Sequence, residues 1–234
     1  MNGRAGAPVE GLRERKKRLM RQELSDTATA MFLERGFDAV RVAEIAQASG
    51  VSEKTVFNYF PVKEALIMDR LESTLAALRA GLADPMLTPV EAALMILDRE
   101  LRAMTGELAG REDPDQVRQA IRRFGDLIRA TPALRAYQAD MMEQSATAAA
   151  EVLAARAGMT PNDPEPQVAA RALLGLWRVQ ADSLRKHLDV APTPARLHDL
   201  VTADVRRAAR LLDTGLHTFT APASPVSEQP VARP

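Results

Sequence analysis

The sequence predicts an all-α protein, and three observations carry that prediction. Ala, Leu, Arg and Glu dominate its 234 residues, and all four favour helix. Aromatic residues, which favour strands, make up only 4% of the chain. No Asn-Gly or Asp-Gly turn stands between alternating apolar runs, so the strongest local hairpin signal is missing. The length suffices for one buried core or two smaller ones.

Capping residues, prolines and glycines mark where the helices begin and end. Thr88 to Glu91 is a capping box with proline at the first helical position. Asp113, Thr131 and Thr193 each precede a proline in the same way. Glycines stand where helical periodicity stops, as C-terminal caps do: Gly36, Gly50, Gly110, Gly158 and Gly215. These signals predict about nine helices, near 12–35, 43–49, 53–59, 62–82, 89–108, 114–129, 132–157, 166–188 and 194–214.

A change of composition near residues 70–80 predicts two domains. Short helices precede it, and longer helices rich in Ala and Leu follow it. We therefore expect a helix-turn-helix domain over 12–66 and a helical domain over 67–218. Residues 1–11, which are small and polar, and the proline-rich residues 219–234 lack periodicity and are predicted to be disordered.

Residues 41–60 carry the clearest functional pattern. Val42, Ile45 and Ala46 are spaced three and one apart and form one apolar face of a short helix. Gly50 ends that helix. Two short helices joined by a turn of three or four residues that contains a glycine are the layout of a helix-turn-helix.

The second of these helices has an inner and an outer face. Ser52 stands at its N-cap, and Val56 and Phe60, four apart, point inward. The outer residues suit DNA: hydroxyl and amide groups bond to base edges, a phenyl ring packs on a thymine methyl, and phenol and ammonium groups reach phosphates. These outer residues are Lys54, Thr55, Phe57, Asn58 and Tyr59, with Lys63 in the first turn of the next helix.

Four stretches in this order and spacing extend the pattern: Met31–Ala39 (MFLERGFDA), Ala43–Ala46 (AEIA), Gly50–Ser52 (GVS) and Phe57–Glu64 (FNYFPVKE). The region resembles the DNA-binding domain of TetR-family transcriptional regulators, over about residues 15–66. The resemblance implies a homodimeric, ligand-responsive regulator, usually a repressor. The second helix would read double-stranded operator DNA in the major groove. The C-terminal domain would bind a small-molecule effector and dimerise through its last two long helices.

Two residues depart from the family pattern. Arg41 replaces a Thr whose hydroxyl contacts phosphate, and a guanidinium there supplies a charge-assisted contact instead. Phe57 replaces a frequent Tyr and removes one phosphate hydrogen bond. The predicted DNA-contacting residues are Arg41, Ser52, Lys54, Thr55, Phe57, Asn58, Tyr59 and Lys63.

Charge agrees with this prediction once it is counted locally. The chain balances 31 basic against 31 acidic residues, which argues against bulk coating of nucleic acid. Residues 1–22, however, hold seven basic and two acidic side chains, a net charge of +5. Such a cluster near the motif predicts contact with flanking phosphates and an affinity that falls with salt.

The effector and dimer surfaces are less sharply marked. Apolar stripes run along the last two predicted helices, and such stripes are more often core than interface. Methionine and aromatic residues in the middle helices predict a largely apolar effector with one polar group, although most of them also fit ordinary packing. The candidate ligand-binding residues are Met95, Met104, Phe124, Ile128, Tyr137, Met141 and Trp177.

Other functions are disfavoured. The chain has no cysteine, and it has no His-x-x-x-His pair, phosphate-binding glycine loop or nucleophile elbow. We expect no enzyme, no cofactor and no metal site. The longest apolar run, Ala92–Leu97, is too short to span a bilayer, and no signal peptide is evident, so a cytoplasmic protein is expected. The alternatives are a helical interaction module without specific DNA binding and a transcriptional activator.

Overall fold

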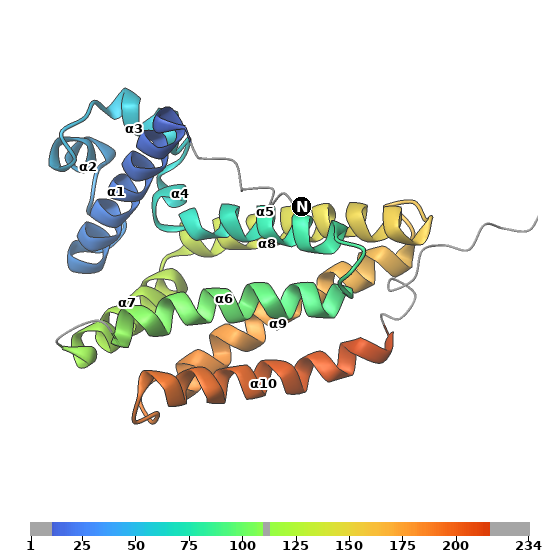
Figure 1. Ribbon diagram of the computed structural model, residues 1–234. Coiled ribbons are helices and arrows are strands. Elements are labelled where there is room, and N and C mark those ends of the chain that lie inside the picture. The colour runs from blue at the N-terminus through green and yellow to red at the C-terminus, as the bar shows by residue number, and fades with distance from the viewer. Residues whose placement is uncertain (1–10, 110–112, 216–234) are drawn as a thin grey trace, which may run out of the picture. The chain divides into compact units, whose positions relative to one another are not determined.

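The computed structural model describes residues 11–109 and 113–215, and within them it consists of α-helices without a strand (Figure 1). The predicted fold class is thereby confirmed. Of the features expected from the sequence, residues 1–10, Gly110, and residues 219–234 lie outside the described residues. The helices are α1 (Leu12–Arg35), α2 (Val42–Ala48), α3 (Glu53–Tyr59), α4 (Lys63–Ile67), α5 (Asp69–Ala83), α6 (Pro89–Ala109), α7 (Pro114–Ala130), α8 (Pro132–Ala157), α9 (Pro164–His187) and α10 (Pro194–Gly215).

The described part has ten helices rather than nine, because the single helix expected over 62–82 is divided. The break lies at Met68, whose φ of −102° and ψ of 15° leave the helical region. The Ser25 hydroxyl, on α1, donates to the Leu66 carbonyl at 2.8 Å. That carbonyl thus has a tertiary partner at the point where the helix ends. Helical periodicity does not depend on such a contact between distant residues, so it predicts one continuous helix here.

The capping bonds predicted at Thr88, Asp113 and Thr193 are present. Thr88 and Glu91 form the reciprocal box, with Thr88 N to Glu91 Oε2 at 2.8 Å and Glu91 N to Thr88 Oγ1 at 3.1 Å. The Asp113 carboxylate accepts from the Gln116 amide at 3.1 Å. Gly36 has a φ of 87°, a conformation that an L side chain rarely adopts, and it ends α1.

The chain divides into two compact units, and the first comprises the residues up to Arg70 together with 123–137. Within it α1 packs against α2 and α4, and α2 packs against α3. Its core is built from apolar side chains of these helices that are almost fully excluded from solvent: Leu24, Ala28, Phe32, Ile45, Val56, Phe60 and Leu66.

The second unit comprises residues 71–122 and 138–234, as far as they are described. Within it α10 packs against α9 and α6, and a continuous apolar core runs through α5, α6, α8, α9 and α10. One polar cluster lies among these helices: the Glu100 carboxylate accepts from Trp177 Nε1 at 3.0 Å and from the Thr74 hydroxyl. Among the described residues no helix is long and apolar enough to cross a membrane.

Candidate DNA-binding surface

The turn between α2 and α3 has the geometry of a helix-turn-helix. Gly50 takes a φ of 67°, and the Val51 amide donates to the Ala46 carbonyl at 2.9 Å. Ser52 is the N-cap of α3, as predicted, because its hydroxyl oxygen accepts from the Thr55 amide at 3.1 Å. The two hydroxyls of Ser52 and Thr55 also lie 2.9 Å apart. The turn is therefore closed by backbone and side-chain bonds together.

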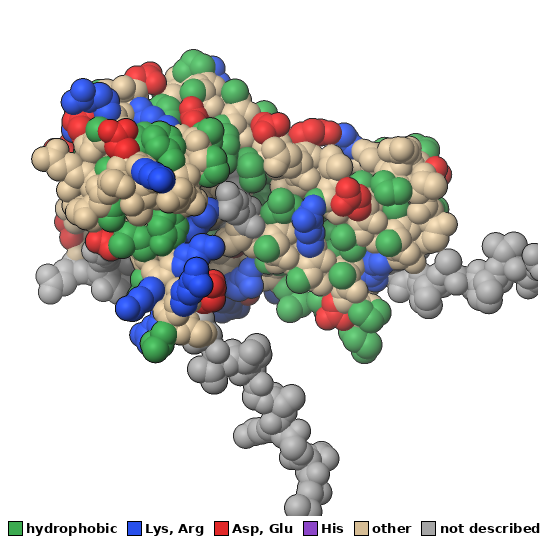
Figure 2. All heavy atoms as spheres, turned by 90° about the horizontal axis from the view of Figure 1, so that it is seen from above, with side chains coloured by type: hydrophobic (Ala, Val, Ile, Leu, Met, Phe, Trp, Pro, Cys, Tyr) green, Lys and Arg blue, Asp and Glu red, His purple; other side chains and the backbone are tan. Residues whose placement is uncertain are grey.

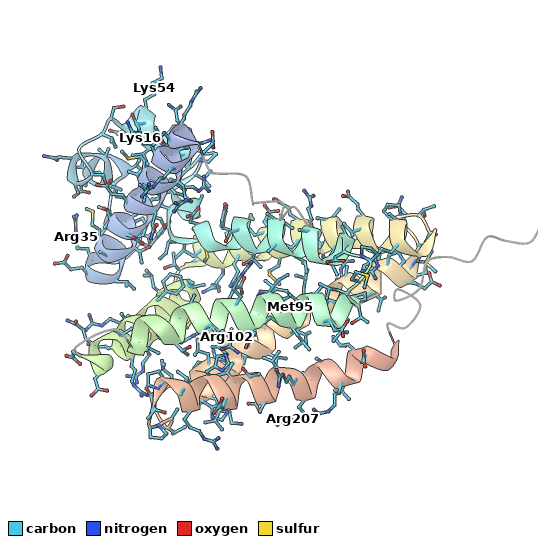
Figure 3. All side chains as sticks on the ribbon, in the orientation of Figure 1. Lys16, Arg35, Lys54, Met95, Arg102 and Arg207 are labelled. Carbon is cyan, nitrogen blue, oxygen red and sulfur yellow. The ribbon has the colours of Figure 1, made fainter. Side chains whose placement is uncertain are left out.

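The faces of α3 divide as the sequence predicts. Val56 and Phe60 are buried in the core of the first unit. Lys54, Phe57 and Asn58 are exposed, and Thr55 and Tyr59 are half-buried. Figure 3 shows Lys54 projecting outward from α3. Phe57 is 44% exposed, so its ring is accessible from outside the protein.

Arg21 of α1 holds the C-terminal end of α3. Its Nη1 donates to the Tyr59 carbonyl at 2.8 Å, and its guanidinium carbon lies 4.5 Å from the centroid of the Phe60 ring. Its Nε also donates to the Asp69 carboxylate at 2.6 Å, at the first residue of α5. One side chain thus connects α1, the end of α3 and the start of α5.

In the sequence, Arg21 stands out only as one of the seven basic residues of 1–22. A signal for its inward position was present, because Arg21 shares a helical face with the buried residues Leu24, Ala28 and Phe32. Spacings of three, four and four place these side chains on one stripe of α1.

Lys63 lies closer to the protein interior than expected for a residue that reaches phosphate. Its ammonium donates to the Phe37 carbonyl at 2.6 Å. It also lies 4.3 Å from the centroid of the Phe37 ring and 5.5 Å from that of Phe32. Burial lowers the pKa of Lys63 from its ordinary value. The ammonium therefore fastens the loop after α1 to α4.

Arg41 stands at the N-cap of α2 with its side chain 82% exposed. An arginine side chain has no acceptor, so the cap is one-sided: the Arg41 amide donates to Glu44 Oε2 at 2.8 Å. The Arg35 guanidinium donates to Glu44 Oε1 at 2.7 Å. These bonds, that of the Arg41 amide first, lower the pKa of Glu44 to about 2.

The Glu44 bonds predict a pH-dependent contribution to stability. Because the pKa is lower in the folded chain than its ordinary 4.5, the carboxylate stabilises the fold above pH 4.5, and this contribution is lost as the pH falls toward 2. In denaturant unfolding at a series of pH values, Glu44→Gln should be less stable than the parent above pH 4.5. The difference should shrink as the pH falls below 4.5. A difference that does not change with pH would contradict this assignment.

Comparisons with known proteins agree with this geometry. The family described as bacterial regulatory proteins, tetR family, matches residues 24–68, and the MftR C-terminal domain family matches residues 97–217, more than half of the chain. The regulator TcmR of Streptomyces glaucescens is 31% identical over 77% of this chain and 83% of its own. The chain belongs to the TetR family. It is a transcriptional regulator with a DNA-binding helix-turn-helix.

Two further matches cover most of the chain. A candidate regulator of mycofactocin biosynthesis from Mycobacterium tuberculosis, MftR, is 29% identical over 72% of this chain and 81% of its own. Among solved structures, GusR of Salmonella enterica is 19% identical over 85% of this chain and 95% of its own, with a TM-score of 0.46.

The candidate ligand residues of this TetR-family chain fall into both units. Phe124, Ile128 and Tyr137 belong to the first unit and are half-buried. The other four belong to the second, where Met141 is buried and Met104 and Trp177 are half-buried, whereas Met95 is 59% exposed. Within the second unit, Trp177 has a polar partner in Glu100.

Proposed function

We propose that this TetR-family regulator binds operator DNA as a homodimer, represses transcription, and releases the DNA when a small, largely apolar effector binds its helical domain. The observation that supports DNA reading most directly is the outer face of α3. Lys54, Phe57 and Asn58 are exposed there, side by side with Thr55. Each good pairing of such groups with a base edge contributes about 1–3 kcal/mol of discrimination.

Basic residues of α1 support binding to the flanking phosphates. The side chains of its first two turns are exposed, and Figure 3 labels Lys16 among them. Figure 2 shows a group of Lys and Arg side chains lying close together on the face in view. Phosphate contacts fix the position of the protein on DNA and make its affinity dependent on salt. The exposed residues are Arg13, Arg15, Lys16, Lys17 and Arg18.

Substitutions at the end of α3 and the start of α4 test the DNA contacts. We expect Tyr59→Ala and Lys63→Ala each to weaken operator binding about tenfold in a mobility-shift assay. Tyr59→Ala removes a phenol at the end of α3, and Lys63→Ala removes the ammonium that fastens the loop after α1 to α4. The melting temperature of each variant shows whether it is folded. This control matters for Lys63→Ala, because the substitution also removes the bond from the Lys63 ammonium to the Phe37 carbonyl.

Arg196→Ala, an exposed change in α10, is the matched control and should bind DNA like the parent. If Tyr59→Ala and Lys63→Ala both melt like the parent and bind DNA equally well, the proposed contacts are wrong.

Exposed apolar residues on α9 and α10 support the homodimer. Val168, in the first turns of α9, is 67% exposed, and Leu211, in the last turns of α10, is 82% exposed. Because α10 packs on α9 after a short connection, these two positions lie toward the same end of the helix pair. A second copy that covers them would remove apolar area from water. A two-fold dimer also suits an operator with two half-sites.

A further inference from the structure

A small crevice opens between α6, α9 and α10 in the second unit. Its volume is about 170 Å³, which exceeds the space of a single water but is below the roughly 300–1,000 Å³ of sites for drug-sized ligands. It is distinct from the surface of α3 and holds only one of the residues singled out from the sequence, Met95. Figure 3 shows Met95 on α6.

The walls of the crevice are largely apolar. Leu94 and Met95 line it from α6 and Val205 from α10. Met95 is 59% exposed although it is one of the more apolar side chains of α6. Methionine is flexible and polarisable, so it adapts to a ligand of irregular shape. These walls suit a short hydrocarbon chain.

Three side chains with hydrogen-bond donors also line the crevice: Gln180 of α9 and Thr202 and Arg206 of α10. The Thr202 hydroxyl is buried and makes no hydrogen bond. The side chains of Gln180 and Arg206 have no hydrogen-bond or ion-pair partner in residues 11–109 and 113–215. A buried polar group without a partner costs free energy, and of these three side chains Thr202 is the one whose polar atom is buried. Gln180 is half-buried and Arg206 is exposed, so both donors are open to a ligand in the crevice.

The Thr202 hydroxyl can reach such a ligand without a change of backbone. A threonine in a helix populates two χ1 rotamers. Rotation about the Cα–Cβ bond of Thr202 therefore moves its hydroxyl relative to the crevice that this side chain lines. Arg206 is exposed, and its guanidinium presents a planar fork of donors that matches a carboxylate. The amide nitrogen of Gln180 adds a donor from the neighbouring helix.

Asp98, the acidic residue of the lining, repels an anion only weakly, because its negative charge is already paired with other side chains. Asp98 accepts from Arg102 Nε at 2.6 Å, and its other oxygen lies 3.0 Å from His198 Nε2. The Arg102 bond also lowers the pKa of Asp98. Arg206 is therefore the lining charge that remains open to a ligand.

The geometry points to a binding site for a small monocarboxylate with a short apolar chain. Its carboxylate pairs with Arg206 and accepts from Gln180 and Thr202, and its chain lies against Leu94, Met95 and Val205. This site is separate from the residues proposed to contact operator DNA, so the two proposals can be tested independently.

Calorimetric titration of the full chain with hexanoate, hexan-1-ol and hexylamine tests the site. We expect hexanoate to bind saturably at one site per chain. Hexan-1-ol and hexylamine should bind at least about tenfold more weakly, because neither has the negative charge and the two carboxylate oxygens that pair with a guanidinium. Trp177, the single tryptophan of the chain, lies three residues before Gln180 on α9 and supplies a fluorescence signal for the same titrations.

Three variants separate binding from folding. Arg206→Met should weaken hexanoate binding about tenfold, whereas Arg196→Met, which removes the same charge from the first turn of α10, should leave it unchanged. Thr202→Val should also weaken binding, yet its melting temperature should equal or exceed that of the parent, because the lost hydroxyl has no partner in the free protein.

Three results would overturn the proposal. The first is the absence of saturable hexanoate binding at millimolar concentration. The second is hexylamine binding as tightly as hexanoate, and the third is equal hexanoate affinity for Arg206→Met and Arg196→Met.

Discussion

The Phe32→Ala variant is expected to lose about 3–5 kcal/mol of unfolding free energy, the cost of removing a large side chain from a packed core. Phe32 is fully buried in the first unit, and its ring lies 5.0 Å from that of Phe37, tilted by 51°. The Lys63 ammonium lies over the same pair of rings. The loss should therefore spread from α1 to the loop after it and to α4. Denaturant unfolding followed by circular dichroism measures the change.

Phe57→Ala is the matched control, since Phe57 belongs to the same unit but is exposed on α3. It should change the unfolding free energy by less than about 0.5 kcal/mol, the usual range for surface substitutions. It should nevertheless weaken operator binding, because the ring is proposed to contact DNA. Similar destabilisation by both substitutions would show that the assigned core is wrong.

The Arg21→Met variant is expected to lose about 2–3 kcal/mol of unfolding free energy and about tenfold in operator affinity. Methionine keeps an unbranched apolar stem but removes the guanidinium, which leaves Asp69 without its bond from Nε and the Tyr59 carbonyl without its bond from Nη1. The side chains of Arg21 and Asp69 are 28% and 24% exposed, so water replaces part of the lost interaction. Affinity falls because the end of α3 is no longer held against α1.

A double-mutant cycle with Asp69→Asn isolates the Arg21–Asp69 interaction. If the two groups act through their contact, the coupling in unfolding free energy should reach about 0.5–3 kcal/mol. Additive effects, within about 0.3 kcal/mol, would show that Arg21 acts through other contacts.

Much of the local structure was predictable because it depends on neighbours in the sequence. The caps at Thr88 and Ser52 need only a side chain and an amide three residues later. The buried face of α3 follows from the spacing of Val56 and Phe60. The family resemblance rests on the same local order of residues, and the family matches confirm it.

What could not be predicted depends on contacts between residues distant in the sequence. The division between α4 and α5 accompanies a bond from Ser25, about forty residues earlier. Lys63 was expected to face phosphate, but the Phe37 carbonyl and two phenyl rings hold its ammonium. Arg21 likewise finds its partners in Tyr59 and Asp69, and no spacing rule connects them.

The account rests on sequence-specific DNA reading by α3, and selection of binding sites from a random DNA pool followed by an affinity titration tests it most directly. We expect the purified chain to enrich a sequence with two symmetric half-sites, whose centres lie about one helical turn or a multiple of it apart. Its affinity for that sequence should fall steeply with salt, and Asn58→Ala should lose most of the preference over scrambled DNA. Equal affinity for enriched and scrambled DNA would contradict the account.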